Sequence, residues 1–158
     1  MAVTDEQVAA LRAYLGMTTD AEDEAVQELI QRLSRPGAGA SIAELVYAAF
    51  VIAARRKFFP AWTRTDVIRF VAQIRALLSE QPDLLDPIAA EHQLRSALGE
   101  KIATYPDAEA RARAQVIFLE ALVQSEALDD AGVTDLLNQA RRLADNLPAL
   151  ASRRDAGE

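Results

Sequence analysis

Hydrophobic residues recur along the chain at the three- and four-residue spacing of amphipathic helices. Residues 41–57 depart from this pattern, because Glu44 is the only charged residue between Ile42 and Ala54. In a globular protein, a helix that is apolar on nearly every side is surrounded by other helices. The pattern therefore predicts a buried central helix over residues 41–57.

Capping residues and helix breakers divide the rest of the chain into further helices. Thr4 and Gln7 have the spacing of a capping box, which satisfies two backbone amides at a helix N-terminus. Asp86 before Pro87 is a second start signal. Pro148 is expected to end the last helix, because proline lacks the amide donor. The predicted helices besides the central one cover residues 4–15, 20–34, 63–78, 87–98, 104–125 and 129–147.

The helix predicted after the central one, over residues 63–78, is amphipathic. Its outer face is expected to carry Asp66, Arg69, Gln73 and Glu80. Its apolar positions are expected to form the core side of the helix. These apolar positions are Val67, Ile68, Phe70, Val71, Ile74, Leu77 and Leu78.

These elements predict an all-α fold, since no run of alternating polar and β-branched residues indicates a strand. We expect a six- to seven-helix orthogonal or up-down bundle around the buried central helix. Residues 1–150 form a single helical domain in this interpretation, and residues 151–158 form a flexible C-terminal tail. The segments 25–34, 70–79 and 116–125 recur at offsets of about 45 residues, so an α-hairpin repeat is the alternative.

The composition indicates a cytoplasmic protein. The chain has no cysteine, which fits a reducing compartment, and its N-terminus lacks the basic and apolar regions of a secretory signal. A membrane-spanning helix needs ~20 apolar residues, more than the central stretch provides, so no membrane association is expected. Abundant alanine, with 15 Arg against 2 Lys, suggests a bacterial source.

The charges are distributed unevenly along the chain. The net charge of −7 argues against non-specific binding to a polyanion, which depends on Lys and Arg displacing counterions. Residues 35–78 nevertheless carry seven basic and two acidic residues. The positive charge is therefore concentrated in and just after the central helix.

Residues that would support catalysis or metal binding are scarce. The single histidine, His92, is not part of a Glu-x-x-His motif of the kind that helical metal sites use. The acidic residues of segment 20–28 lack the glycine and spacing of a calcium-binding loop, and no phosphate-binding or nucleophile motif occurs. We predict no catalytic residue, no cofactor and no metal site, and a protein that is not an enzyme.

The corner of the chain that begins at Arg55, at the end of the predicted central helix, has a composition that helix capping explains only in part. Cations at the C-terminus of a helix are favoured by its dipole, but here aromatic residues and further arginines follow at once. The rings either fold back as a cap on the core, form a contact surface for a protein, or form a stacking surface for nucleic acid. The candidate partner-binding residues are Arg55, Arg56, Lys57, Phe58, Phe59, Trp62, Arg64 and Arg69.

The favoured hypothesis is a small, non-enzymatic protein–protein interaction or regulatory module, an accessory to a bacterial system. Phe58, Phe59 and Trp62 would anchor a protein partner, and Arg55, Arg56 and Arg64 would orient its acidic surface. The alternative is a helix-turn-helix-like DNA-binding regulator with a recognition helix that begins at Thr63–Thr65. The acidic net charge disfavours nucleic acid as a partner, and pairing with a second copy of the chain stays open.

Overall fold

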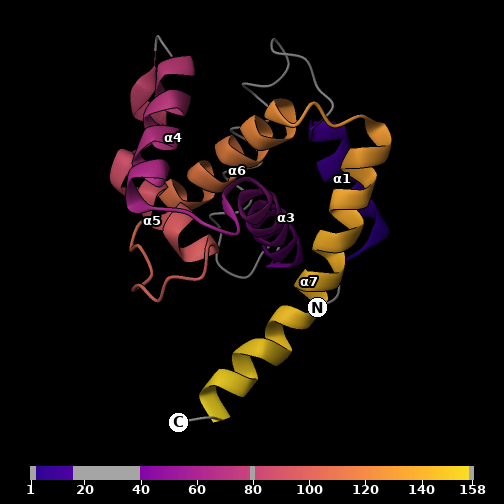
Figure 1. Ribbon diagram of the computed structural model, residues 1–158. Coiled ribbons are helices and arrows are strands. Elements are labelled where there is room, and N and C mark those ends of the chain that lie inside the picture. The colour runs from indigo at the N-terminus through magenta and orange to yellow at the C-terminus, as the bar shows by residue number, and fades with distance from the viewer. Residues whose placement is uncertain (1–2, 16–39, 79–80, 157–158) are drawn as a thin grey trace.

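Helix α3 (Ala40–Phe58) runs through the centre of the computed structural model (Figure 1), which describes residues 3–15, 40–78 and 81–156. Between Leu45 and Ala54, every residue except Tyr47 and Ile52 is buried. The other helices surround α3, so its nearly uniform apolar surface is covered on most sides. The predicted buried central helix is confirmed.

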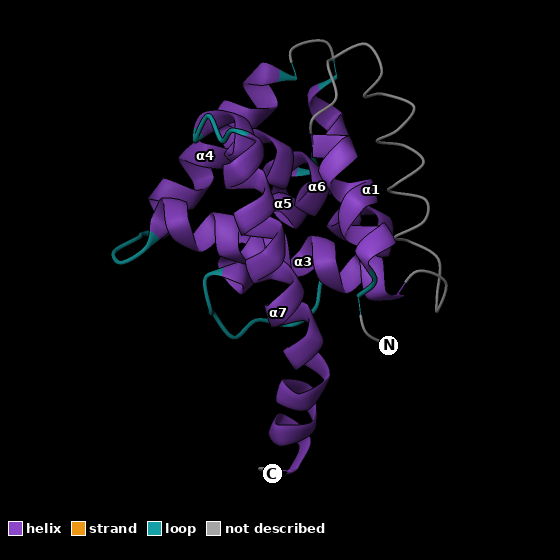
Figure 2. Cartoon of the chain, turned by 90° about the vertical axis from the view of Figure 1, so that its right-hand side faces the viewer, coloured by secondary structure: helices purple, strands orange, loops and turns teal. Residues whose placement is uncertain are grey.

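The remaining helices lie on two sides of α3 (Figures 1 and 2). Helix α7 packs on one side of α3 and also against α1, while α6 packs on another side and carries α5. Helix α4 packs on α5, and a short 3-10 turn, η1, joins the two. The described residues form only helices and loops, so the predicted all-α bundle is confirmed. The bounds are α1 Asp5–Leu15, α4 Arg64–Leu77, η1 Pro82–Leu84, α5 Pro87–Ala97, α6 Ala108–Ser125 and α7 Asp130–Ala156.

Most helices begin where the capping signals predict. The backbone N–H of Thr4 donates to Gln7 Oε1 at 3.0 Å, and the N–H of Gln7 donates to Thr4 Oγ1 at 3.2 Å, which completes the capping box. The Asp86 side chain accepts from two amides at the start of α5. The start of α6 differs from the prediction, because Asp107 caps this helix and it begins at Ala108.

The end of α7 also differs from the prediction, because the helix continues through Pro148 to Ala156. Proline removes one amide donor and crowds the carbonyl four residues earlier, but a helix can absorb this loss with a kink. The prediction that Pro148 ends the helix is therefore wrong. The flexible tail over residues 151–158 stays a prediction.

Two sequence predictions involve segments outside the described residues. The helix predicted over residues 20–34 lies there, and so does the first of the three segments proposed as repeats. In the described part, α4 packs on α5, whereas α6 and α7 both pack on α3. The α-hairpin repeat stays a prediction.

A continuous series of phenylalanine rings leads from the centre of the core to the C-terminal end of α3. The ring centroids of Phe50 and Phe118 are 6.1 Å apart, and those of Phe118 and Phe70 are 5.5 Å apart. Phe70 then meets Phe58 edge to face at 5.6 Å. Aromatic rings at these separations attract each other beyond the burial of their area. The series joins α3, α6 and α4 and ends at the corner that the sequence singled out.

Candidate functional site

The three candidate aromatic residues do not share one environment. Phe58, the last residue of α3, is 8% exposed and packs on Phe70. Phe59, the next residue, is 45% exposed, and Trp62 is half-buried against the core. The corner is therefore partly a cap on the core and partly a surface, because consecutive positions of a helix point about 100° apart.

Short hydrogen bonds position this corner at the end of α3 and the start of α4. The N–H of Phe59 donates to the Arg55 carbonyl at 2.9 Å, which extends the helical hydrogen bonding of α3 by one residue. Thr63 then caps α4, since its hydroxyl accepts from the Asp66 N–H at 3.2 Å and its own N–H donates to Asp66 Oδ2 at 2.9 Å. The two helices are thereby joined through a connection of only a few residues.

Three of the candidate arginines make bonds within the chain. Arg55 Nε donates to the carbonyl of Ala97 at 3.0 Å, at the C-terminal end of α5. Arg56 donates to Gln139 Oε1 at 3.2 Å, and Arg64 Nε donates to Glu91 Oε1 at 2.8 Å. The structure therefore uses these arginines to connect α3 to α5 and α7, and α4 to α5.

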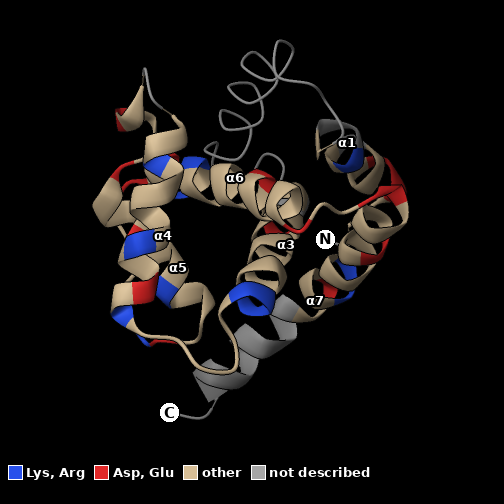
Figure 3. Cartoon of the chain, turned by 45° about the horizontal axis from the view of Figure 1, so that its top comes forward, with Lys and Arg blue, Asp and Glu red and all other residues tan. Residues whose placement is uncertain are grey.

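The two remaining candidate cations, Lys57 and Arg69, flank a notch between the end of α3 and the start of α4. We call it the α3–α4 notch. Neither cation has a carboxylate partner among the described residues. Figure 3 shows basic residues at the end of α3 and along α4. The notch has a volume of about 270 Å³ and is lined by Lys57, Phe58, Ala61, Asp66, Arg69, Phe70 and Gln73.

The floor of the notch is aromatic and its charge is unbalanced. Lys57 Nζ lies 4.9 Å from the centroid of the Phe70 ring and 6.0 Å from that of Phe58. Among the described residues of the lining, Asp66 is the only carboxylate, and its Oδ2 already accepts the Thr63 amide. The notch therefore presents Lys57 over two apolar rings and Arg69 in the same lining, an arrangement that suits an acidic side chain on an apolar stem.

The sequence predictions identified only part of this lining. Lys57, Phe58 and Arg69 were candidates, whereas Phe70 was assigned to the core, and Asp66 and Gln73 to the outer face of their helix. A signal for them exists in the spacing, because positions 66, 69, 70 and 73 share one side of a helix. That side becomes a wall of the notch only because the connection after α3 brings α4 back against it.

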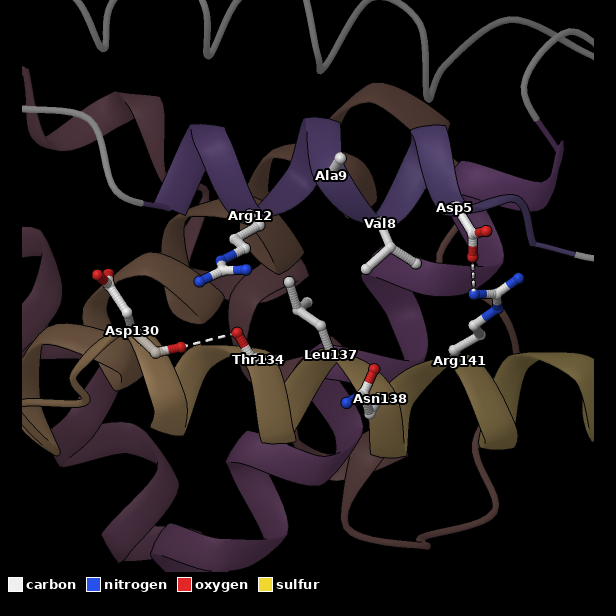
Figure 4. A pocket seen from close by; sticks show the side chains of 9 residues that line it. All are labelled: Asp5, Val8, Ala9, Arg12, Asp130, Thr134, Leu137, Asn138 and Arg141. Carbon is white, nitrogen blue, oxygen red and sulfur yellow. Dashed lines mark hydrogen bonds and ion pairs between the residues drawn. The ribbon is translucent and has the colours of Figure 1, made fainter.

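A second hollow is a groove of about 580 Å³ between α1 and α7 (Figure 4). Arg12 extends across it from α1 toward α7, and Arg141 makes an ion pair with Asp5 and donates to the carbonyl of Val3 at 2.9 Å. Its two arginines are matched by two aspartates. This balance gives the groove no preference for one sign of ligand charge. The lining residues are Asp5, Val8, Ala9, Arg12, Asp130, Thr134, Leu137, Asn138 and Arg141.

Arg95 and Glu100 form a structural ion pair outside the two hollows. Arg95 Nε donates to Glu100 Oε2 at 2.7 Å across the turn after α5. This hydrogen bond lowers the pKa of Glu100 and raises the pKa of Arg95. His92 packs its ring against Tyr105, with the centroids 5.8 Å apart.

No cluster of three or more histidine, cysteine or acidic side chains in the described ranges could hold a metal ion. Within the same ranges, no helix has the length and apolar character to cross a bilayer.

Comparison of the chain with protein families, curated proteins and solved structures found no match in any of the three. The α3–α4 notch combines Lys57 and Arg69 with the edges of two largely buried rings, Phe58 and Phe70.

Proposed function

We propose that the chain is a non-enzymatic protein–protein interaction module that binds an acidic partner at the α3–α4 notch. One observation carries the proposal: Lys57 and Arg69 flank an aromatic floor without a carboxylate partner among the described residues, while the arginines around them are engaged. A carboxylate from a partner could form ion pairs with these two cations. The role suits a regulatory or accessory protein.

The size and surroundings of the notch favour a protein over a small molecule. Pockets for small ligands have volumes of about 300–1,000 Å³, and the notch, at about 270 Å³, has room for one or two side chains. Phe59, the residue after Phe58 of the lining, is 45% exposed, and its ring centroid lies 5.5 Å from the guanidinium carbon of Arg55. Exposed aromatic rings beside arginines are typical of residues that dominate binding at protein interfaces.

DNA binding at the same corner has weaker support. A recognition helix beginning at Thr63–Thr65 would use Arg64 for phosphates or bases, but Arg64 is paired with Glu91. The net charge of −7 also disfavours a polyanion as the ligand. The helix-turn-helix hypothesis stays a prediction, and duplex DNA serves as the competing ligand in the test.

The test compares capture by two double variants that change the net charge equally. Lys57→Glu/Arg69→Glu reverses the notch, and Lys101→Glu/Arg142→Glu reverses two exposed cations whose side chains make no bond among the described residues. Each protein is immobilised and exposed to an extract of the cells in which the chain occurs. The wild type and the control are expected to retain the same partner, and the notch variant to lose it. Equal retention by both variants contradicts the proposal.

A labelled DNA duplex then separates the two hypotheses. Anisotropy of the duplex is measured with the wild-type protein at two salt concentrations. A DNA-binding protein loses affinity steeply as salt rises, because it displaces counterions from the phosphates. We expect no such binding. Binding that weakens steeply as salt rises would favour the DNA-binding hypothesis over the interaction module.

A further inference from the structure

The outer face of α4 is more apolar than the sequence pattern predicts. Ile68 is 48% exposed and Leu77 is 78% exposed, although both were assigned to the core. The reason is that α4 is covered on one side only, where Val67, Phe70, Val71 and Ile74 are buried. The exposed positions form two adjacent rows with a spacing of four residues. One row is Ile68, Ala72 and Ala76, and the other is Arg69, Gln73 and Leu77.

Helix α5 widens this apolar face. Arg64 near the start of α4 pairs with Glu91 of α5, and Arg75 near the end of α4 donates to the Leu85 carbonyl just before α5. The two helices are therefore antiparallel. Ile68 lies one turn from Arg64, and Ile88 lies one turn from Glu91, so the two isoleucines lie on neighbouring turns of the pair. Ile88 is 67% exposed.

The α3–α4 notch lies at one end of the same face. Arg69 belongs both to the notch and to the row that ends at Leu77. These two residues are eight positions apart, which is about 12 Å along a helix, or two turns. The face thus has a positive end at Arg69 and an apolar end at Leu77. Two side chains placed two turns apart on a second helix could contact both ends. The alanines between them, Ala72 and Ala76, leave room for close approach of another backbone.

We propose that the outer face of α4 binds an acidic amphipathic helix of the partner protein, which deepens and rests on the function proposed above. An acidic residue of that helix meets Lys57 and Arg69, and an apolar residue two turns away packs on Leu77. Charge complementarity selects this occupant. A second copy of α4 would offer only Asp66, whose Oδ2 already accepts the Thr63 amide.

The experiment selects binders from a library of helix-stabilised peptides of about 18 residues, long enough for five turns, with one face randomised. The baits are the wild type, Leu77→Glu, Lys57→Glu/Arg69→Glu, and the control Ala131→Glu, which adds one negative charge at an exposed position of α7. Circular dichroism verifies that each bait is folded. Peptide affinities are then measured by anisotropy.

Enriched peptides are expected to carry an acidic residue and an apolar residue two turns apart. They should bind the wild type and Ala131→Glu equally, and bind Leu77→Glu and the notch variant about tenfold more weakly, as loss of one interface anchor does. The proposal is overturned if the enriched peptides lack this pattern or bind Leu77→Glu as tightly as the wild type. It is also overturned if the wild-type bait enriches no more peptides than the Leu77→Glu bait does. A wild-type dimer that Leu77→Glu dissociates, seen by analytical ultracentrifugation, also overturns it, because the face then belongs to a second copy.

The two proposals fail in different ways. If Lys57→Glu/Arg69→Glu loses its captured partner and Leu77→Glu retains it, the proposed binding at the notch is supported. The proposal that a partner helix binds along the outer face of α4 is then wrong. If both variants retain the partner, the proposed function itself is wrong.

Discussion

Lys57 places its ammonium nitrogen 4.9 Å from the centroid of the Phe70 ring. An aromatic face attracts a cation through its quadrupole but does not neutralise it. A carboxylate in the same place would form an ion pair and cancel the charge. The side chain of Lys57 is therefore held in position while its charge stays available to a partner.

A double-mutant cycle can measure this contact. Lys57→Met, Phe70→Leu and the double variant are compared with the wild type by urea denaturation followed by circular dichroism. We expect a coupling free energy of about 0.5–1 kcal/mol, which is the range for a cation–π contact made by a solvent-exposed cation. Additive single effects would show that the ring does not hold the lysine.

Two Phe→Ala substitutions, one inside the phenylalanine series and one outside it, should lower the free energy of unfolding by very different amounts. Phe118 is fully buried and contacts both Phe50 and Phe70, so Phe118→Ala is expected to lower the free energy of unfolding by about 3–5 kcal/mol. Phe59→Ala, at a half-exposed position, should cost less than about 1 kcal/mol. Urea denaturation measures both. Similar losses would contradict the placement of these rings.

The N-terminal segment is attached to α7 by polar contacts. Arg141 donates to the Val3 carbonyl at 2.9 Å and pairs with Asp5, and the Val3 amide donates to Asp145 Oδ1 at 3.3 Å. We expect Arg141→Ala to lower the free energy of unfolding by about 1–2 kcal/mol and to speed amide exchange in α1. The neighbouring Arg142→Ala is the matched control and should change stability by less than about 0.5 kcal/mol. Equal effects would rule out the attachment.

Two helix ends share one hydrogen-bond pattern but differ in the residue at the turn. After α5, Gly99 has φ +97°, and after α6, Ala127 has φ 49°. In both, the next residue's N–H donates to the carbonyl five positions back, at 3.1 Å from Glu100 to Arg95 and 3.3 Å from Leu128 to Val123. A positive φ strains any residue with a Cβ atom.

Opposite substitutions should therefore have opposite effects. Gly99→Ala is expected to destabilise the protein by about 1 kcal/mol, although a Cβ there meets no atom within 4 Å. Ala127→Gly is expected to stabilise it by up to about 1 kcal/mol, because the strain is relieved. Thermal denaturation of the two single variants gives the signs directly. The same sign for both would show that strain at the turn is not the deciding factor.

The Arg95–Glu100 pair gives a pH dependence whose sign follows from the pKa shift. The pKa of Glu100 is lowered in the folded state by the hydrogen bond from Arg95. The pair therefore stabilises the fold above the ordinary carboxyl pKa, and this contribution is lost as the pH falls through the lowered value. The stability difference between wild type and Glu100→Gln should favour wild type near about pH 7, begin to shrink as the pH falls to the ordinary carboxyl pKa, and be lost once the pH is below the lowered pKa of Glu100. A constant difference from neutral to acidic pH would contradict this.

The central helix and most helix starts were predictable because their signals are local. The capping box at Thr4 and the Asp86–Pro87 pair act within one turn of chain, and the nearly uncharged stretch of α3 requires burial whatever surrounds it. The end of α7 was not predictable in this way. The local cost of Pro148 does not by itself determine whether the helix continues.

The candidate site could be predicted only in part, because it depends on contacts between residues far apart in the sequence. The pattern of hydrophobic and polar residues does not contain such contacts. Phe58 and Phe59 are chemically identical neighbours, and Phe58 is the buried one, packed on Phe70 of α4. Arg64 was expected to be free for a partner but meets Glu91 across two helices. Ile68 fits an apolar stripe yet is exposed, because α4 lies at the edge of the bundle with one side uncovered.

The chain contains a single tryptophan, Trp62, and it lies in the short connection between α3 and α4. Its indole is half-buried against the core, and the residue before it, Ala61, lines the α3–α4 notch. Indole emission shifts in wavelength and intensity when its exposure to water changes. The unlabelled protein therefore has an intrinsic optical probe beside the notch, so occupancy of that corner can be followed by a change in emission on titration.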